Sequence, residues 1–140
     1  MTLDKIISIS GKPGLYEILS AGKRNVIVQS LVDKKRFPIT AVNNLNALDS
    51  IAIYTFTEEV PLSEVLYTIY QKESGKPCIS HKESKDKLVA YFLEILPEYD
   101  TERVYISNIK KVLQWYNILI QAQFDFETLA PTGDEDKSGK

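Results

Sequence analysis

Cys78 and His81 are the one cysteine and the one histidine of the chain, and their close spacing raises the question of metal or nucleophilic chemistry. A structural zinc site needs four ligands, and the sequence has no further cysteine or histidine to supply them. A nucleophilic cysteine needs surroundings that lower its pKa, and nothing in the sequence around Cys78 supplies them. We therefore predict no metal, no cofactor and no catalytic residues, and expect a protein that is not an enzyme. An enzyme whose site is built from less obvious residues is the alternative.

A second pattern with chemical potential is Gly11-Lys12-Pro13-Gly14, in which two glycines enclose a lysine. Glycines at this spacing clamp nucleic-acid backbones in KH domains. Here, however, strand-like residues flank the stretch, and Pro13 has no backbone N–H to donate. We predict instead a hairpin turn at 12–14, with Gly14 at the position that requires a positive φ.

Basic residues form three short clusters that are candidates for binding an anion or a nucleic acid. Such a surface requires the clusters to converge in space, and solvated loops with a solvated helix face are the alternative. The net charge of −2 weakens the expectation of tight, non-specific binding to nucleic acid. The candidate residues are Lys23, Arg24, Lys34, Lys35, Arg36, Lys110 and Lys111.

Aromatic residues are frequent in the second half of the chain, and most of them fall on apolar stripes that indicate core packing. Trp115 lies beside its stripe rather than at the centre, and tryptophan is a favoured anchor at binding surfaces. We therefore predict a contact with a protein partner, or with a second copy of the chain, at Tyr105, Trp115 and Leu119.

The elements that must position these residues divide the chain near residue 58. The first part alternates apolar and polar residues in strand-like segments at 4–10, 15–20, 25–32, 36–41 and 50–56, with a helical turn expected at 41–46. This order predicts a five-stranded, SH3-like small β-barrel over residues 1–58. An open antiparallel meander is the alternative.

The second part, residues 59–126, has the periodicity of three helices. Pro61 begins the first, a capping box of Ser80 and Glu83 precedes the second, and Ser107 caps the third. The fold class is therefore α+β. Residues 127–140 are polar and acidic, and we predict a disordered tail.

Composition places the chain in a broad class. It has 140 residues, enough for a core without disulfides, and a single cysteine fits a reducing compartment. No stretch has the length and apolarity of a signal peptide or a membrane span. We expect a cytoplasmic protein that does not enter the membrane.

Several strings carry a resemblance to a known family: LDKIISISGKPGLYEILS, KRFPIT, IAIYTFTEEVPLSEV and LPEYDTERVYISNIKKVLQWYNIL. They resemble a small family of uncharacterised bacterial proteins from the Bacteroidetes, over roughly residues 1–121. The resemblance implies a small N-terminal β domain followed by a helical domain. It implies no catalytic residues, because the family has no assigned activity.

The predicted function is a non-enzymatic binding or adaptor module that contacts a protein partner, or itself, through its helical surface. Association with nucleic acid is the alternative. It would use the basic hairpin loops together with residues 84–122, whose helix–linker–helix order resembles the SAP type of DNA-binding motif.

Overall fold

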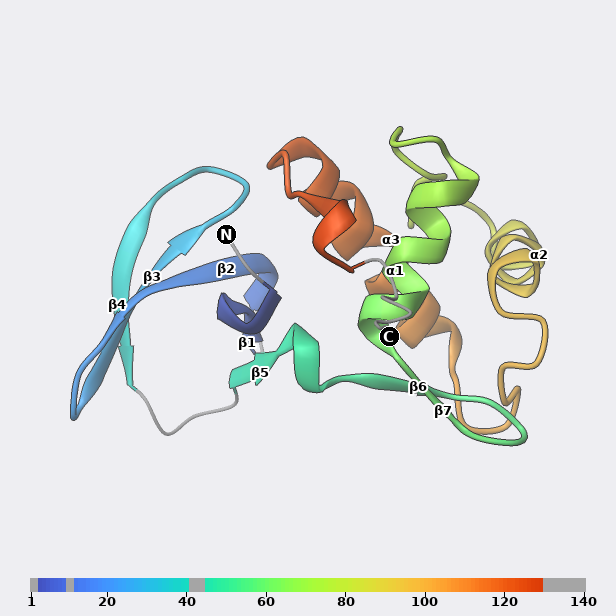
Figure 1. Cartoon of the computed structure of the whole chain (residues 1–140), viewed down its shortest axis with the longest axis horizontal. Coiled ribbons are helices and arrows are strands. Elements are labelled where there is room, and N and C mark those ends of the chain that lie inside the picture. Colours follow the sequence, from blue (N-terminus) through green and yellow to red (C-terminus); the bar gives the residue numbers. More distant parts are fainter. Residues whose placement is uncertain (1–2, 10–11, 41–44, 130–140) are drawn as a thin grey trace, which may run out of the picture.

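The computed structural model describes residues 3–9, 12–40 and 45–129. It has an antiparallel sheet at one end and three helices at the other, joined by the segment that runs from the last strand of the sheet toward the helices (Figure 1). The predicted α+β class is confirmed. No helix within the described ranges combines the length and apolarity needed to cross a membrane.

The sheet has five strands in the order β4-β3-β2-β1-β5. Its strands are β1 (Ile6–Ile9), β2 (Lys12–Ala21), β3 (Asn25–Ser30), β4 (Arg36–Thr40) and β5 (Leu45–Ala47). Burial alternates along β3, where Val26, Val28 and Ser30 are buried and their neighbours are not. This is the period of two that the sequence predicts for a strand with one covered face. Pro38, which cannot donate to a ladder, lies in the edge strand β4.

The sheet is open, so the predicted SH3-like closure is not observed in the described residues and the meander alternative describes them better. The segment expected to close the barrel forms β6 (Ala52–Tyr54), which pairs with β7 (Glu59–Pro61) in a separate two-stranded sheet. Buried Thr55 holds the turn between them: its Oγ1 accepts the Glu58 N–H at 2.9 Å and donates to the Glu58 carbonyl at 2.7 Å. Because residues 52–54 pair locally with β7, they are not available as the fifth strand of a barrel.

The fifth strand of the sheet is therefore β5, in the region where the sequence predicts a helical turn. The turn itself lies a few residues later, as the 3₁₀ helix η2 (Leu48–Ser50). Residues 41–44 of the predicted turn fall outside the described residues.

The prediction of a turn at 12–14 is wrong, because these residues belong to β2. Ile9 pairs with Lys12, so the connection between β1 and β2 falls at residues 10–11, outside the described part. Ile7 pairs with Tyr16, which gives β2 two more residues than β1 over this stretch and creates a β-bulge. Gly14 lies in the bulge with φ of +88°, so the expected positive φ is correct although its setting is not.

The three helices are α1 (Leu62–Lys72), α2 (Lys85–Ile95) and α3 (Ile106–Gln121). Each buries the apolar stripe that the sequence predicts, and two of the predicted caps are displaced. The Ser84 side chain, rather than a box of Ser80 and Glu83, accepts an N–H at the start of α2. Tyr105, rather than Ser107, precedes α3, and its N–H donates to Oδ1 of Asn108 at 2.8 Å.

One hydrophobic core joins the sheet to the helices across residue 58. Leu15 of β2 and Leu48 of η2 lie in the same buried cluster as Leu66 of α1 and Leu113 of α3. The short N-terminal helix η1 (Leu3–Lys5) and the C-terminal helix η3 (Phe126–Leu129) add Leu3 and Phe126 to it. The opposite face of the sheet has a smaller cluster of its own around Tyr16.

The predicted disordered tail begins at residue 127, but residues 127–129 complete η3. The remainder of that prediction, residues 130–140, lies outside the described residues.

Candidate functional site

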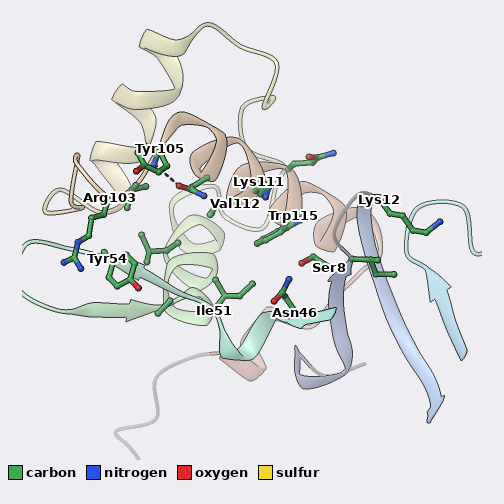
Figure 2. A pocket seen from close by; sticks show the side chains of 17 residues that line it. Ser8, Lys12, Asn46, Ile51, Tyr54, Arg103, Tyr105, Lys111, Val112 and Trp115 are labelled. Atoms are coloured by element: carbon green, nitrogen blue, oxygen red, sulfur yellow. Dashed lines mark hydrogen bonds between the residues drawn. The ribbon is translucent and has the colours of Figure 1, made fainter. Parts of the chain in front are cut away.

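A cavity of about 560 Å³ lies where β1, β6 and the N-terminal half of α3 face one another, and we call it the sheet–helix cleft. Trp115 projects into the middle of the cleft from α3, and Asn46 of β5 and Ile51, which precedes β6, face it (Figure 2). The lining residues are Ser8, Ile9, Lys12, Gly14, Asn46, Ile51, Ala52, Ile53, Tyr54, Arg103, Val104, Tyr105, Asn108, Lys111, Val112, Gln114 and Trp115.

Two of the three predicted partner-binding residues line this cleft. Trp115 is partly buried, packing against the core on one side, and Tyr105 is 64% exposed at the start of α3. Leu119 is different, because it is 0% exposed and belongs to the core. Its place on the stripe of α3 directs it inward, so it offers no surface to a partner and that part of the prediction is corrected.

Of the residues that the structure describes, the charged ones that line the cleft are all cations: Lys12, Arg103 and Lys111. In Figure 2, Arg103 and Lys12 lie at opposite ends of the cleft with their charged groups directed outward. The ammonium group of Lys12 lies 5.2 Å from the centre of the Phe37 ring. Each end of the cleft thus carries a cation, although the Lys12 ammonium lies over Phe37 and the Arg103 guanidinium pairs with Asp100.

Arg103 is held in place by its neighbours. Its Nε donates to Oδ2 of Asp100 at 2.9 Å, and its guanidinium carbon lies 4.3 Å from the centre of the Tyr54 ring. The hydrogen bonds from Arg103 and from the Glu102 N–H lower the pKa of the Asp100 carboxyl group below its ordinary value. The ion pair thus fixes one end of the cleft.

The predicted basic clusters do not meet in one place. Lys23 and Arg24 lie in the connection before β3, and Lys34 and Lys35 lie in the connection after it, with Arg36 beginning β4. The two groups are separated by the length of a six-residue strand, about 20 Å. Lys110 and Lys111 are both exposed on α3, and Lys111 alone of the seven lines the cleft.

The sequence interpretation did not single out Arg103, Ala52 or Tyr54 as site residues. Arg103 lies in the linker between α2 and α3 as an isolated cation, and a search for clusters passes over it. Ala52 and Tyr54 belong to a strand whose partner was predicted incorrectly. Their position in the cleft follows from the β6–β7 pairing, for which the sequence has no distinct signal.

A second cavity, of about 590 Å³, is lined by both Cys78 and His81. Burial raises the pKa of the Cys78 thiol to about 12, with the charge of Glu73 as a further cause, so the thiol is protonated at neutral pH. Asn117 of α3 fixes this loop, since its Oδ1 accepts the Cys78 N–H at 2.8 Å. Among the described residues, no group of three or more histidine, cysteine or acidic side chains is arranged to hold a metal ion.

Comparison with known proteins gives two family matches and one solved structure. Residues 3–48 match a family described as Domain of unknown function (DUF5606), and residues 51–119 match Domain of unknown function (DUF6852). A protein from Bacteroides vulgatus, solved in solution by NMR, is 47% identical, covers 89% of each chain and superposes with a TM-score of 0.73. No curated protein matches the chain.

Proposed function

We propose a function for this chain, which belongs to the Bacteroidetes-type family marked by two domains of unknown function, DUF5606 followed by DUF6852. The proposed function is that of a non-enzymatic binding module, which receives a protein partner in the sheet–helix cleft. The cytoplasmic location stays a prediction from the sequence.

The observation that carries this proposal is the position of Trp115 inside the cleft. Its ring has the core behind it and the cavity in front, which is the setting of an anchor residue rather than of a purely structural one. Exposed Tyr105 lies at the rim, so two aromatic side chains with few torsions to freeze are available to one partner. The volume of the cleft is within the range typical of ligand sites.

Nucleic acid is the second candidate, because the charged side chains that line the cleft within the described ranges are all cationic. A single strand could stack bases on Trp115 and set its phosphates against Lys111 and Arg103. Binding of this kind weakens steeply with salt, so a titration with single-stranded DNA and RNA at several salt concentrations measures it directly. Absence of binding at low salt would remove this candidate.

The protein-partner proposal is tested with matched aromatic variants. Trp115→Ala and Tyr105→Ala change the cleft, whereas Phe56→Ala removes a similarly exposed aromatic residue that does not line it. A protein captured by the wild type is purified, and its direct affinity for each variant is measured by calorimetry. Analytical ultracentrifugation of the same variants covers self-association.

We expect each cleft variant to weaken binding by about tenfold or more and Phe56→Ala to leave it unchanged. Circular dichroism of each variant verifies the fold. Equal affinity for all the variants would refute the cleft as the partner site.

A further inference from the structure

The hydrogen-bond register of β6 leaves one of its edges facing the cleft. The Thr55 N–H donates to the Glu58 carbonyl at 2.7 Å, and the Leu62 N–H donates to the Ile51 carbonyl at 2.8 Å. Between these two bonds, the alternation of an antiparallel ladder makes Ile53 and Val60 the next hydrogen-bonded pair. Ala52 and Tyr54 therefore direct their N–H and C=O groups away from β7.

Another segment of the chain covers part of the β6 edge that faces away from β7. The Phe56 N–H donates to the Glu98 carbonyl at 3.0 Å, and the Asp100 N–H donates to the Tyr54 carbonyl at 2.9 Å. These bonds flank an antiparallel bridge between Thr55 and Tyr99. Residues 98–100 thus lie alongside the C-terminal end of β6, connected through an isolated bridge rather than as a strand.

The backbone pairing with β6 stops at Asp100. Its side chain accepts the Glu102 N–H at 2.9 Å, and its carbonyl accepts the Val104 N–H at 2.9 Å, so the backbone turns away from β6. Within the described part of the chain, the N–H and C=O of Ala52 and the N–H of Tyr54 have no hydrogen-bond partner. Both residues line the cleft, so the unfinished edge opens into it.

We propose that the sheet–helix cleft binds an extended, acid-rich segment of a partner protein, which adds as a strand to β6 at Ala52. The inference rests on the proposed function and specifies both the chemistry of the partner and its mode of binding. The edge offers donors and an acceptor at strand spacing, and a peptide backbone supplies the complementary groups. A phosphate backbone only accepts hydrogen bonds, so the edge favours a peptide over a nucleic acid.

Charge complementarity determines the composition of the segment. Among the described residues, Lys12, Arg103 and Lys111 line the cleft and no carboxylate does, although Asp100 pairs with Arg103 beside it. Side chains of an added strand alternate between two directions. Apolar side chains at one set of positions would contact Trp115, while Asp or Glu at the other set would lie near the cations at the rim.

The chain provides its own probe, because Trp115 is its sole tryptophan. The fluorescence of the full-length protein is titrated with a capped peptide of three Val-Glu repeats, and with a matched peptide of Val-Lys repeats. We expect saturable binding of the Val-Glu peptide that weakens with salt, and binding of the Val-Lys peptide about tenfold weaker or undetectable. Equal binding of the two peptides would overturn the charge argument and with it the proposal.

Backbone methylation tests strand addition itself. One version of the Val-Glu peptide is N-methylated at its valines and another at its glutamates, so that each version blocks one edge of the added strand. Strand addition requires that one version lose about tenfold or more in affinity and that the other bind within about threefold of the parent. Any other pattern overturns strand addition.

Two neighbouring lysines provide matched variants. Lys111 lines the cleft and Lys110, the next residue on α3, is exposed but does not. We expect Lys111→Glu to weaken the Val-Glu peptide by about tenfold and Lys110→Glu to change its affinity by less than about twofold. Equal effects would show a diffuse charge attraction and overturn the site.

Two further ligands distinguish the remaining occupants. Tighter binding of an oligothymidine than of any peptide would assign the cleft to nucleic acid, and tighter binding of a peptide of residues 130–140 would assign it to the chain's own C-terminus. Either result overturns the proposal. A partner that depends on Trp115 but tolerates both methylated peptides would leave the proposed function standing while this inference fails.

Discussion

Gly14 is the residue at which the backbone of β2 leaves ordinary strand geometry, and Gly14→Ala measures what that departure costs. Its φ of +88° is strained for a residue with a side chain, by about 1–2 kcal/mol. A Cβ at this position would lie 3.7 Å from Cγ2 of Val32, an ordinary contact, so the cost is conformational rather than steric. Alanine also reduces the entropy of the unfolded chain, which returns about 0.4–1 kcal/mol. The net loss of unfolding free energy is therefore about 1 kcal/mol.

Gly22→Ala is the matched control. Gly22 does not have a positive φ, and a Cβ there would lie 3.4 Å from the Asn25 carbonyl oxygen. Gly22→Ala should therefore change stability mainly by reducing the conformational entropy of the unfolded chain. The free energies of unfolding of the two variants should differ by about 1–2 kcal/mol, which is the strain alone. Urea denaturation followed by circular dichroism measures both, with equal m-values as a check. A difference below about 0.5 kcal/mol would refute the assignment of Gly14 to a strained bulge.

Three further predictions concern the loops beside the two cavities. Asn117→Ala removes the acceptor of the Cys78 N–H and the donor to the carbonyls of Cys78 and Ile79. It should lower the free energy of unfolding, measured by urea denaturation, by about 2 kcal/mol, and a loss below about 0.5 kcal/mol would contradict this. Cys78, with its pKa raised to about 12, should react with iodoacetamide at pH 8 about a thousandfold more slowly than free cysteine; a rate within tenfold of free cysteine would show that the thiol is not held as described. The pKa of Asp100 is lowered in the folded protein, so its contribution to stability is present above the unfolded pKa and is lost as pH falls through the folded pKa. In thermal melts, the difference between the wild type and Asp100→Asn should accordingly be largest at neutral pH and vanish in acid, and a constant difference would argue against the pair with Arg103.

The helices are the part of the fold that the sequence predicts best, and the reason is that their signal is local. Apolar residues at intervals of three and four define one face without reference to any distant segment. The stripe of α3, from Ile109 through Leu113 to Tyr116, is buried as predicted. Helix starts are less reliable, because several residues near a start can serve as caps. Ser84 and Tyr105 occupy the positions that the sequence interpretation assigned to Ser80 and Ser107.

The sheet shows the limit of the same reasoning. Alternation identifies a strand and its two faces, but it does not say which strand lies beside it. Residues 52–54 were expected beside the other N-terminal strands, and they pair instead with residues 59–61 across the turn held by Thr55. The hydroxyl of Thr55 contacts groups only two and three residues away, so a local interaction decides a pairing that the alternating pattern leaves open.

The sequence predicted only part of the candidate site, because residue types are visible in the sequence whereas their arrangement in space is not. Trp115 and Tyr105 were noted for their residue type, and the structure brings them into one cleft, although their role with a partner stays a prediction. Lys110 and Lys111 are equivalent in the sequence, and only the direction of α3 distinguishes them. Arg103 has no basic neighbour in the sequence, yet it occupies one end of the cleft.

The failed prediction of a barrel and the presence of the cleft have a single structural cause. Had residues 52–54 closed the sheet, their outer edge would have been paired with another strand. Because they turn back on β7, one edge of β6 faces α3, and residues 98–100 cover it only as far as Tyr54. An unfinished edge is a liability in most proteins, and natural sheets cover it, charge it or use it to bind. Here it opens into the cleft beside Trp115, with Arg103 and Lys111 nearby, which is the position that the proposed extended segment would occupy.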